Sequence, residues 1–384
     1  MTYLKSIYVH NCYTSKNFAI DFSPKPGESL RHLILTGKNG SGKTTILKAL
    51  DNTIGKGQFD GVMAKVDFNP NHRDLLATDA IEPKVTVALI HGENTKEFLK
   101  EGIYGYLKVE RKTPTLVVSG PKKLELTDLT GTESLSQLFI QFLVNKKTEQ
   151  AYAYQDGDQQ SVQRIEQWFD HFEQQLQFLF ECAELRLEFS RKEFNFYFRL
   201  PEQARFDFNQ LSHGYASILS IITEILMLHE SKNAQFSDNL PGIILIDEIE
   251  NHLHLELQEK ILPFLTMIFP QIQFIVATHS PAVIASIDNA TVYDLDNHRT
   301  VNENLMGIPY HVLMKSHFGI ESEYSRFVTE KLKEAKALIQ KGKARTKQDN
   351  ETLQQLAREL DKLSPDLSLE IFLELEHQKI NDKN

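Results

Sequence analysis

The sequence predicts an α/β protein with a mixed sheet at its core, an α+β insertion and a helical C-terminal tail. Three observations support this fold class. A glycine-rich turn joins an apolar strand to a helix within residues 33–50, and further apolar runs of strand length follow at 242–246 and 272–278. Helical periodicity separates these runs and follows them. Continuous apolar runs of this length are typical of parallel strands that are buried on both faces.

The first 200 residues read mainly as strands, with one long helix among them. We expect strands at 2–10, 17–22 and 30–36, a helix at 45–54, an irregular segment at 55–71, and a meander of strands at 84–91, 104–112 and 113–120. In residues 161–182 apolar residues recur every three or four positions, which predicts an amphipathic helix. Residues 185–200 alternate again around a charged turn, which predicts a hairpin.

From residue 210 onward, helices and buried strands alternate. We expect helices at 210–228 and 255–269, and strands at 242–246, 272–278 and 290–296. Beyond about residue 307 the chain is charged and helix-periodic, with helices near 322–341, 347–362 and 366–378. This tail carries apolar residues at helical spacing: Phe327, Leu332, Leu338, Leu353, Leu356, Leu360, Leu369 and Phe372. Such residues need a covering surface, so we expect the tail from Ser322 to serve assembly.

Composition and charge narrow the class of protein. No apolar run reaches the roughly 18 residues of a membrane span, and the N-terminus lacks the apolar segment of a signal peptide. Cys12 and Cys182 provide neither a disulfide framework nor a cysteine zinc site. The net charge of −10 argues against a chain that coats nucleic acid by bulk electrostatics. We therefore expect a cytoplasmic protein without a membrane segment, in which any contact with nucleic acid occurs through a complex.

The glycine-rich turn has the features of a phosphate-binding loop. It reads Gly37-Lys38-Asn39-Gly40-Ser41-Gly42-Lys43-Thr44 and fits G-x-x-x-x-G-K-[ST] between a strand and a helix. Glycines let successive N–H groups point at phosphate oxygens, and the helix N-terminus adds partial positive charge. We expect Lys43 to reach the β- and γ-phosphates, Thr44 to bind Mg²⁺, and Thr45 to complete the nucleotide-binding set. The alternative is an ordinary glycine-rich turn.

An acidic pair and a histidine follow two of the buried strands. Asp247 is placed to hold Mg²⁺ through water beside Thr44, and Glu248 to polarise a water molecule for attack on the γ-phosphate. The alternative is a pair of solvated carboxylates. His279 follows the next strand, so it would reach the γ-phosphate and the attacking water. On its own, it would more often be a buried and satisfied imidazole.

A fourth motif, Leu-Ser-x-Gly at 211–214, begins a helix between the phosphate loop and the acidic pair. In this order the four motifs, spread over residues 1–90 and 200–296, resemble the ABC-type ATPase superfamily of P-loop NTPases. The resemblance implies ATP and Mg²⁺ as ligands and a head-to-tail dimer around two ATP molecules. Ser212 and Gly214 would then contact the γ-phosphate bound by the second copy. His213 and Tyr215 depart from the common Leu-Ser-Gly-Gly-Gln form, which puts the rate of ATP hydrolysis, but not the activity itself, in question.

Further segments narrow the resemblance to one branch. The run "DEIENHLHLELQ" resembles RecF, SMC and OLD-type heads more than transporter subunits. The interval before residue 211 is too short for an SMC arm, and the tail shows no TOPRIM nuclease motif. With this insertion and tail, the chain is similar to anti-phage defence ATPases such as the PtuA subunits of Septu and retron systems, which work with an HNH nuclease. We find no convincing candidate at 60–90 for the γ-phosphate-sensing glutamine of the superfamily.

The resemblance implies a domain plan and a function. The ABC-type head would comprise 1–90 and 200–300, the insertion 91–199, and the helical assembly region 301–384. The chain would be an ATP-hydrolysing switch subunit, a homodimer or higher oligomer, that gates an HNH nuclease or other effector in bacterial anti-phage defence. The alternatives are a RecF-like DNA repair or recombination ATPase that binds DNA directly, a transporter subunit, and an enzyme with its own nuclease site.

Overall fold

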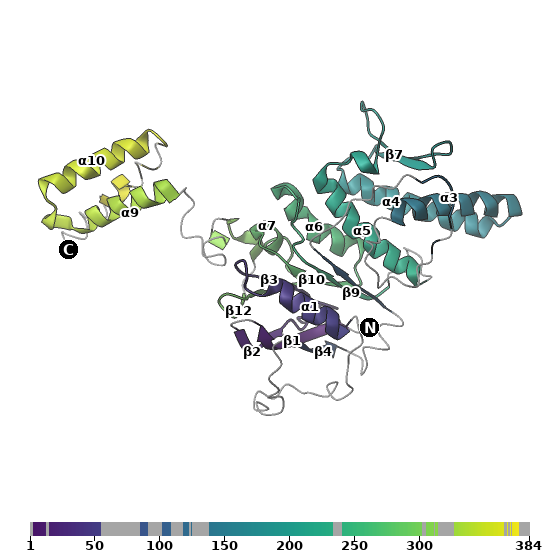
Figure 1. Cartoon of the computed structure of the whole chain (residues 1–384), viewed down its shortest axis with the longest axis horizontal. Helices are drawn as coiled ribbons and strands as arrows, with labels where there is room; N and C mark the ends of the chain where they lie inside the picture. The colour runs from purple at the N-terminus through teal and green to yellow at the C-terminus, as the bar shows by residue number, and fades with distance from the viewer. Residues whose placement is uncertain are drawn as a thin grey trace. The chain divides into compact units, whose positions relative to one another are not determined.

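The computed structural model describes residues 3–12, 15–54, 85–90, 102–108, 118–122, 124, 138–232, 240–301, 305–310, 312–313, 326–364, 367, 369 and 371–375. The chain divides into two compact units, Met1–Tyr310 and His311–Asn384. Figure 1 shows the elements of the first unit in purple to green and the helices of the second in yellow.

A six-stranded sheet forms the centre of the first unit, in the order β12-β11-β3-β10-β9-β5. Its strands are β12 (Arg299–Val301), β11 (Ala290–Asp294), β3 (His32–Thr36), β10 (Ile272–Ala277), β9 (Gly242–Ile246) and β5 (Ile103–Leu107). Only β12 pairs antiparallel with its neighbour; the other pairings are parallel. Every residue of β3, β9 and β10 is buried, as their apolar runs predicted. The carboxyl ends of these parallel strands therefore meet at one edge of the sheet.

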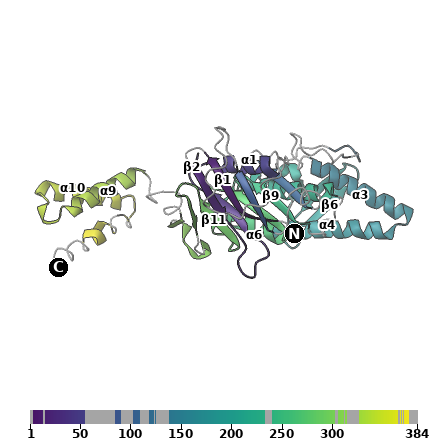
Figure 2. The ribbon, with the colours of Figure 1, turned by 90° about the horizontal axis from the view of Figure 1, so that it is seen from below.

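A second, antiparallel sheet packs against the first through helix α1 (Lys43–Ile54). It contains β2 (Ser15–Asp21), β1 (Tyr3–Cys12) and β4 (Val85–Ile90) in that order. Apolar side chains from β1, β2, α1 and the central sheet form one continuous core, which includes Leu4, Ile20, Leu47, Leu50, Leu245 and Ile275. Figure 1 shows α1 between the two sheets, and Figure 2 shows β1 and β2 from below. This packing fixes the N-terminal end of α1 at the carboxyl edge of the central sheet.

The described part of the first unit also contains four longer helices: α3 (Phe139–Asp156), α4 (Gln159–Leu179), α5 (His213–Ser231) and α6 (Leu255–Ile268). The predicted hairpin is confirmed as β6 (Arg186–Ser190) and β7 (Asn195–Arg199), to which β8 (Phe206–Asp207) adds a third strand. No helix among the described residues has both the length and the apolar content needed to cross a membrane.

Helix α3 was not predicted from the sequence, although α4 was. The two helices lie side by side and turn at Gly157 (Figure 1). The buried residues of α3 are concentrated in its first six positions, and beyond them only Ala153 is buried. Buried apolar residues spaced three or four positions apart are therefore missing over most of α3, whereas α4 buries residues along its whole length.

The predicted meander is wrong. β4 pairs antiparallel with β1, whereas β5 runs parallel to β9 in the other sheet. β5 therefore belongs to the central sheet and not to a separate insertion at 91–199, because an alternating pattern predicts a strand but not its partner. Residues 118–120 are not a strand, and 109–117 lie outside the described residues, as does the segment 55–71 that we expected to be irregular.

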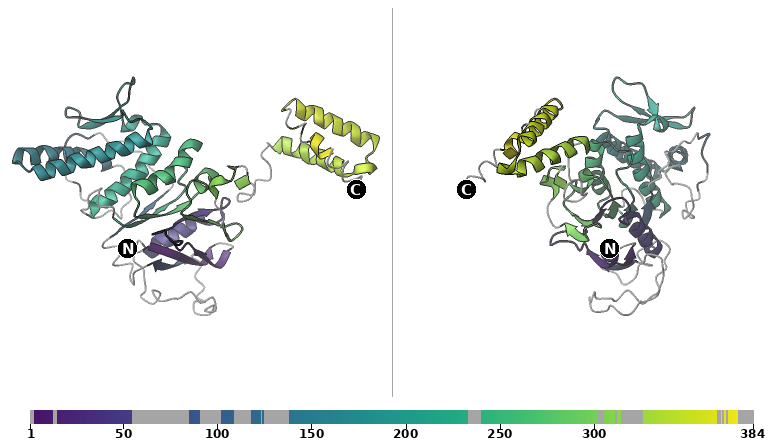
Figure 3. Two further views of the ribbon diagram at one scale, coloured as in Figure 1. Left: turned by 180° about the vertical axis from the view of Figure 1, so that it is seen from behind. Right: turned by 60° about the vertical axis from the view of Figure 1, so that its left-hand side comes forward.

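The second unit has an apolar core of its own. Helices α9 (Arg326–Gln340) and α10 (Lys347–Asp361) lie side by side (Figure 3), and positions 367, 369 and 371–375 are also helical. Of the apolar tail residues named above, five are buried in this core: Leu332, Leu338, Leu353, Leu356 and Leu360. Phe327, Leu369 and Phe372 are exposed. The buried positions thus pack largely against one another.

Candidate active site

The predicted phosphate loop connects β3 directly to α1. Gly37, Gly40 and Gly42 have φ values of 138°, 83° and 101°, in the region that glycine adopts without strain. A Cβ atom at Gly37 would lie 2.9 Å from Ser41 Oγ. The loop conformation therefore depends on glycine at these positions, and Asn39 lies exposed between them.

The ammonium group of Lys43 lies inside this loop. Its Nζ donates to the carbonyl oxygens of Gly37 at 2.9 Å and Lys38 at 3.0 Å. Burial lowers the pKa of Lys43, and the negative charges of Asp296 and Glu250 oppose this effect. The cation is therefore held where the loop curls, and its contact with the β- and γ-phosphates stays a prediction.

The phosphate loop meets the acidic strand end through a hydrogen bond. Thr44 Oγ1 donates to Asp247 Oδ1 at 3.1 Å, although the two residues are 203 positions apart. Asp247 follows β9 and is buried, and its backbone N–H donates to the carbonyl of Leu107 at 3.0 Å. A hydroxyl beside a carboxylate is an all-oxygen donor set of the kind that Mg²⁺ prefers. Thr44 and Asp247 therefore fit a magnesium ion.

Glu248 and His279 lie at the same edge of the sheet. Glu248 has a φ of 46°, a left-handed conformation that is uncommon outside glycine and is often found at functional sites. The backbone N–H of His279 donates to Glu250 Oε1 at 2.5 Å, and Thr278 Oγ1 donates to Glu250 Oε2 at 2.7 Å. Glu250, whose place in the site was not predicted, therefore fixes the segment that carries His279.

Electrostatic interactions connect these groups. Partial burial and then the positive charge of Lys43 lower the pKa of His279, while the negative charges of Glu248, Asp296 and Asp247 oppose the lowering. A charge shifts the pKa of a neighbour only over a short range. The structure thus brings together the predicted Lys43, Asp247, Glu248 and His279.

Two further residues at the site were also missed. Asp296 follows β11, and its Oδ2 accepts a hydrogen bond of 2.5 Å from the backbone N–H of Lys38. Tyr106 on β5 hydrogen-bonds to Asp247; burial, followed by the negative charge of Asp247, raises the pKa of its phenol. Neither residue has a local sequence signal, because its role depends on which strand pairs with β3 or β9.

The remaining predicted residues lie outside this group or at its margin. Thr45 is half-buried in the first turn of α1. Ser212 is exposed at the N-cap of α5 and makes no side-chain capping bond. Gly214 is buried, and a Cβ atom there would lie 2.9 Å from a methyl group of Leu257. The role of Ser212 and Gly214 toward a second copy stays a prediction.

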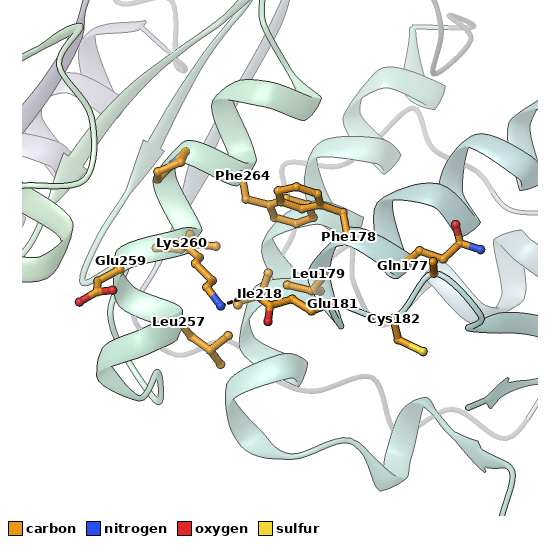
Figure 4. Close-up of a pocket in the computed structure, with 13 residues that line it drawn as sticks. Gln177, Phe178, Leu179, Glu181, Cys182, Ile218, Leu257, Glu259, Lys260 and Phe264 are labelled. Atoms are coloured by element: carbon orange, nitrogen blue, oxygen red, sulfur yellow. Dashed lines mark hydrogen bonds and ion pairs between the residues drawn. The ribbon is translucent and has the colours of Figure 1, made fainter. Parts of the chain in front are cut away.

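An apolar cavity of about 590 Å³ lies elsewhere, between α5, α6 and the C-terminal end of α4. The rings of Phe178 and Phe264 stack in it with centroids 5.4 Å apart, and Lys260 forms an ion pair with Glu181 beside them (Figure 4). Its lining contains none of the site residues described above. The cavity is therefore separate from the phosphate loop.

Comparisons with known proteins identify the family of the chain. The family model described as "AAA domain, putative AbiEii toxin, Type IV TA system" matches residues 89–285, just over half of the chain. The matched segment contains the acidic pair and His279 but not the phosphate loop, which precedes it.

Individual relatives match over different lengths of the chain. The chain is 27% identical over 318 residues to "Septu protein PtuA" of Bacillus mycoides (strain KBAB4), covering 77% of this chain and 41% of that protein. It is 43% identical over 90 residues to "Retron Ec83 probable ATPase" of Escherichia coli, covering 23% and 17%. The matched regions thus span less than half of these relatives. A solved structure, "SMC head domain from Thermotoga maritima", gives a TM-score of 0.39 at 17% identity, covering 75% of this chain and 94% of that one.

Proposed function

The chain belongs to the AAA-domain family whose model matches it, and on this premise we propose that it is an ATP-binding and hydrolysing switch subunit of bacterial anti-phage defence. Two copies would bind head-to-tail around two ATP molecules and gate an effector, such as an HNH nuclease. The names of the PtuA and retron relatives support the defence setting. Because the matches span less than half of those relatives, the effector and trigger are part of the proposal.

One observation carries the nucleotide site: the hydrogen bond between Thr44 and Asp247. It joins the glycine-rich loop to the acidic strand end, so phosphate-binding and cation-binding groups share one location. Thr44 and Asp247 would hold Mg²⁺, and the ammonium of Lys43 would exchange its loop carbonyls for phosphate oxygens. When bound, Mg²⁺ would supply charge stabilisation to the phosphate oxygens.

Hydrolysis needs a base and a group that contacts the γ-phosphate. The Glu248 carboxylate would take a proton from the attacking water as the bond between the γ-phosphorus and the ADP oxygen breaks. His279 would contact the γ-phosphate, since Glu250 fixes its backbone. Its lowered pKa favours a neutral imidazole at neutral pH.

The head-to-tail dimer is supported by the N-terminal end of α5, where Ser212 and His213 are exposed. The hydroxyl of Ser212 makes no capping bond, and the first N–H groups of a helix have no partner within it. Such a helix end can bind an anion. Ser212 and the Gly214 N–H would therefore bind the γ-phosphate held by the other copy.

The Glu248→Gln variant tests this function. It should bind ATP but hydrolyse it slower by roughly 10²–10⁴-fold, the usual contribution of a positioned general base. Light scattering should show an ATP-dependent dimer that persists in the variant. Glu256→Gln, the same change at an exposed position of α6, should behave like the wild type. Unchanged turnover in Glu248→Gln would show that another residue is the base, with His279 the next candidate. Stimulation of the ATPase activity by plain duplex DNA would favour a DNA repair ATPase.

A further inference from the structure

Strand β5 presents two tyrosines to α1 and one glycine to α5. Tyr104 and Tyr106 pack against the core that contains α1, and the Tyr104 hydroxyl donates to Asp51 Oδ1 of α1 at 3.0 Å. Gly105, between them, faces the other way, since a Cβ atom there would lie 2.7 Å from a methyl group of Leu228 on α5. Successive residues of a strand point to opposite faces, so the two hydroxyls share the side of the sheet on which α1 begins.

Asp247 is held by β5 at its backbone and at its side chain. Parallel pairing sets Leu107 opposite Ile246, and the Asp247 N–H donates to the Leu107 carbonyl at 3.0 Å. Tyr106 stands opposite Leu245 in this pairing, and both side chains pack on the α1 side of the sheet, where Asp247 accepts the Thr44 hydroxyl. From there the Tyr106 phenol hydrogen-bonds to the Asp247 carboxylate. Two hydroxyl donors from different elements restrict the rotation of the carboxylate more than one donor can.

We propose that Tyr106 is a positioning residue of the magnesium–nucleotide site, which orients the Asp247 carboxylate toward Thr44 and the cation. This proposal rests on the proposed function, because it assumes that ATP binds with Mg²⁺ at Thr44 and Asp247. Partners that hydrogen-bond to a metal-binding carboxylate typically change metal affinity about 10–100-fold when removed. Tyr106 would contact neither ATP nor Mg²⁺ and would act through Asp247.

The test compares Tyr106→Phe with Tyr104→Phe. Each variant loses one phenolic hydroxyl from the same face of the same strand, but only the first loses a bond to Asp247. Calorimetric titration measures the affinity for ATP in EDTA and in Mg²⁺, and the ratio of the two affinities isolates the contribution of the cation. In Tyr106→Phe this ratio should fall about 10-fold or more, while the affinity in EDTA stays near that of the wild type. In Tyr104→Phe the ratio should be unchanged.

The other outcomes overturn the proposal in distinguishable ways. If wild type shows the Mg²⁺ effect and Tyr106→Phe keeps it in full, Tyr106 does not position Asp247, while the nucleotide site stands. Equal losses in both variants would mean that the β5 hydroxyls act only through the packing of the strand. If the ATP affinity of the wild-type protein does not depend on Mg²⁺, both the proposed magnesium–nucleotide site and the role of Tyr106 are refuted. Trp168 fluorescence, from the chain's one tryptophan, verifies that each variant is folded.

Discussion

His32, on the strand that leads into the phosphate loop, should make the stability of the first unit depend on pH. It is 2% exposed, and its Nδ1 accepts a hydrogen bond of 3.0 Å from the backbone N–H of Phe274 on β10. An imidazole that accepts at Nδ1 is neutral, with its proton on Nε2. Burial, and then the charge of Arg31, lower the pKa of His32 to about 4. Protonation would place two donors against each other in the core.

The magnitude follows from the difference between the folded and unfolded pKa values. Above pH 6.5, the ordinary histidine pKa, the ring is neutral in both states and the stabilisation is fully present. Between pH 6.5 and about 4 the unfolded chain binds the proton more strongly than the folded protein does. The free energy of unfolding therefore decreases as the pH is lowered through this range. At about 1.36 kcal/mol per pKa unit, the loss amounts to about 3 kcal/mol.

Urea unfolding between pH 7 and pH 4, followed by the fluorescence of Trp168 in the same unit, measures this loss. In His32→Asn the Asn Oδ1 can accept the Phe274 N–H but does not titrate. Wild type should lose about 3 kcal/mol more than this variant over the range. His254→Asn, the same change at an exposed histidine, should follow wild type. If the free energy of unfolding depends on pH in the same way in wild type and in His32→Asn, protonation of His32 does not differ between the folded and unfolded states. That result would refute the reasoning.

Two further predictions concern the phosphate loop and the second unit. Lys43→Ala should abolish tight ATP binding, because it removes the ammonium group that the loop holds; near wild-type affinity by calorimetry would contradict the loop assignment. Removing residues 311–384 should leave ATP binding measurable, because that unit has its own core, while higher assembly or effector association is lost. Light scattering with and without the candidate effector measures this; assembly equal to that of the full chain would restrict the second unit to local packing.

The sequence predicted the parts of the site that local patterns encode. The glycine spacing, the acidic pair after β9 and His279 after β10 could be found because parallel strands end at one edge, so residues after them come close. Glu250, Asp296 and Tyr106 could not, because each acts through a partner that is distant in the sequence.

The same limit explains the errors in the fold. The strand at β5 was recognised but placed in a meander, since alternation does not reveal a pairing partner. Helix α3 was missed because most of its length buries almost nothing. Two of the three expected tail helices were found as α9 and α10, and the described positions of the third are helical as well. Of the six leucines picked out by their spacing, five are buried and Leu369 is exposed.

The phosphate loop is already held in shape by bonds within the protein. Lys43 donates to the carbonyls of Gly37 and Lys38, and the carboxylate of Asp296 accepts the N–H of Lys38. Ordering a free backbone costs about 1–2 kcal/mol of conformational entropy per residue, so a loop of this length that had to order around its ligand would consume much of the binding free energy. Here the folding of the sheet has already met that cost. In the proposed dimer, the free energy of phosphate contacts then remains available for closing two heads on each other.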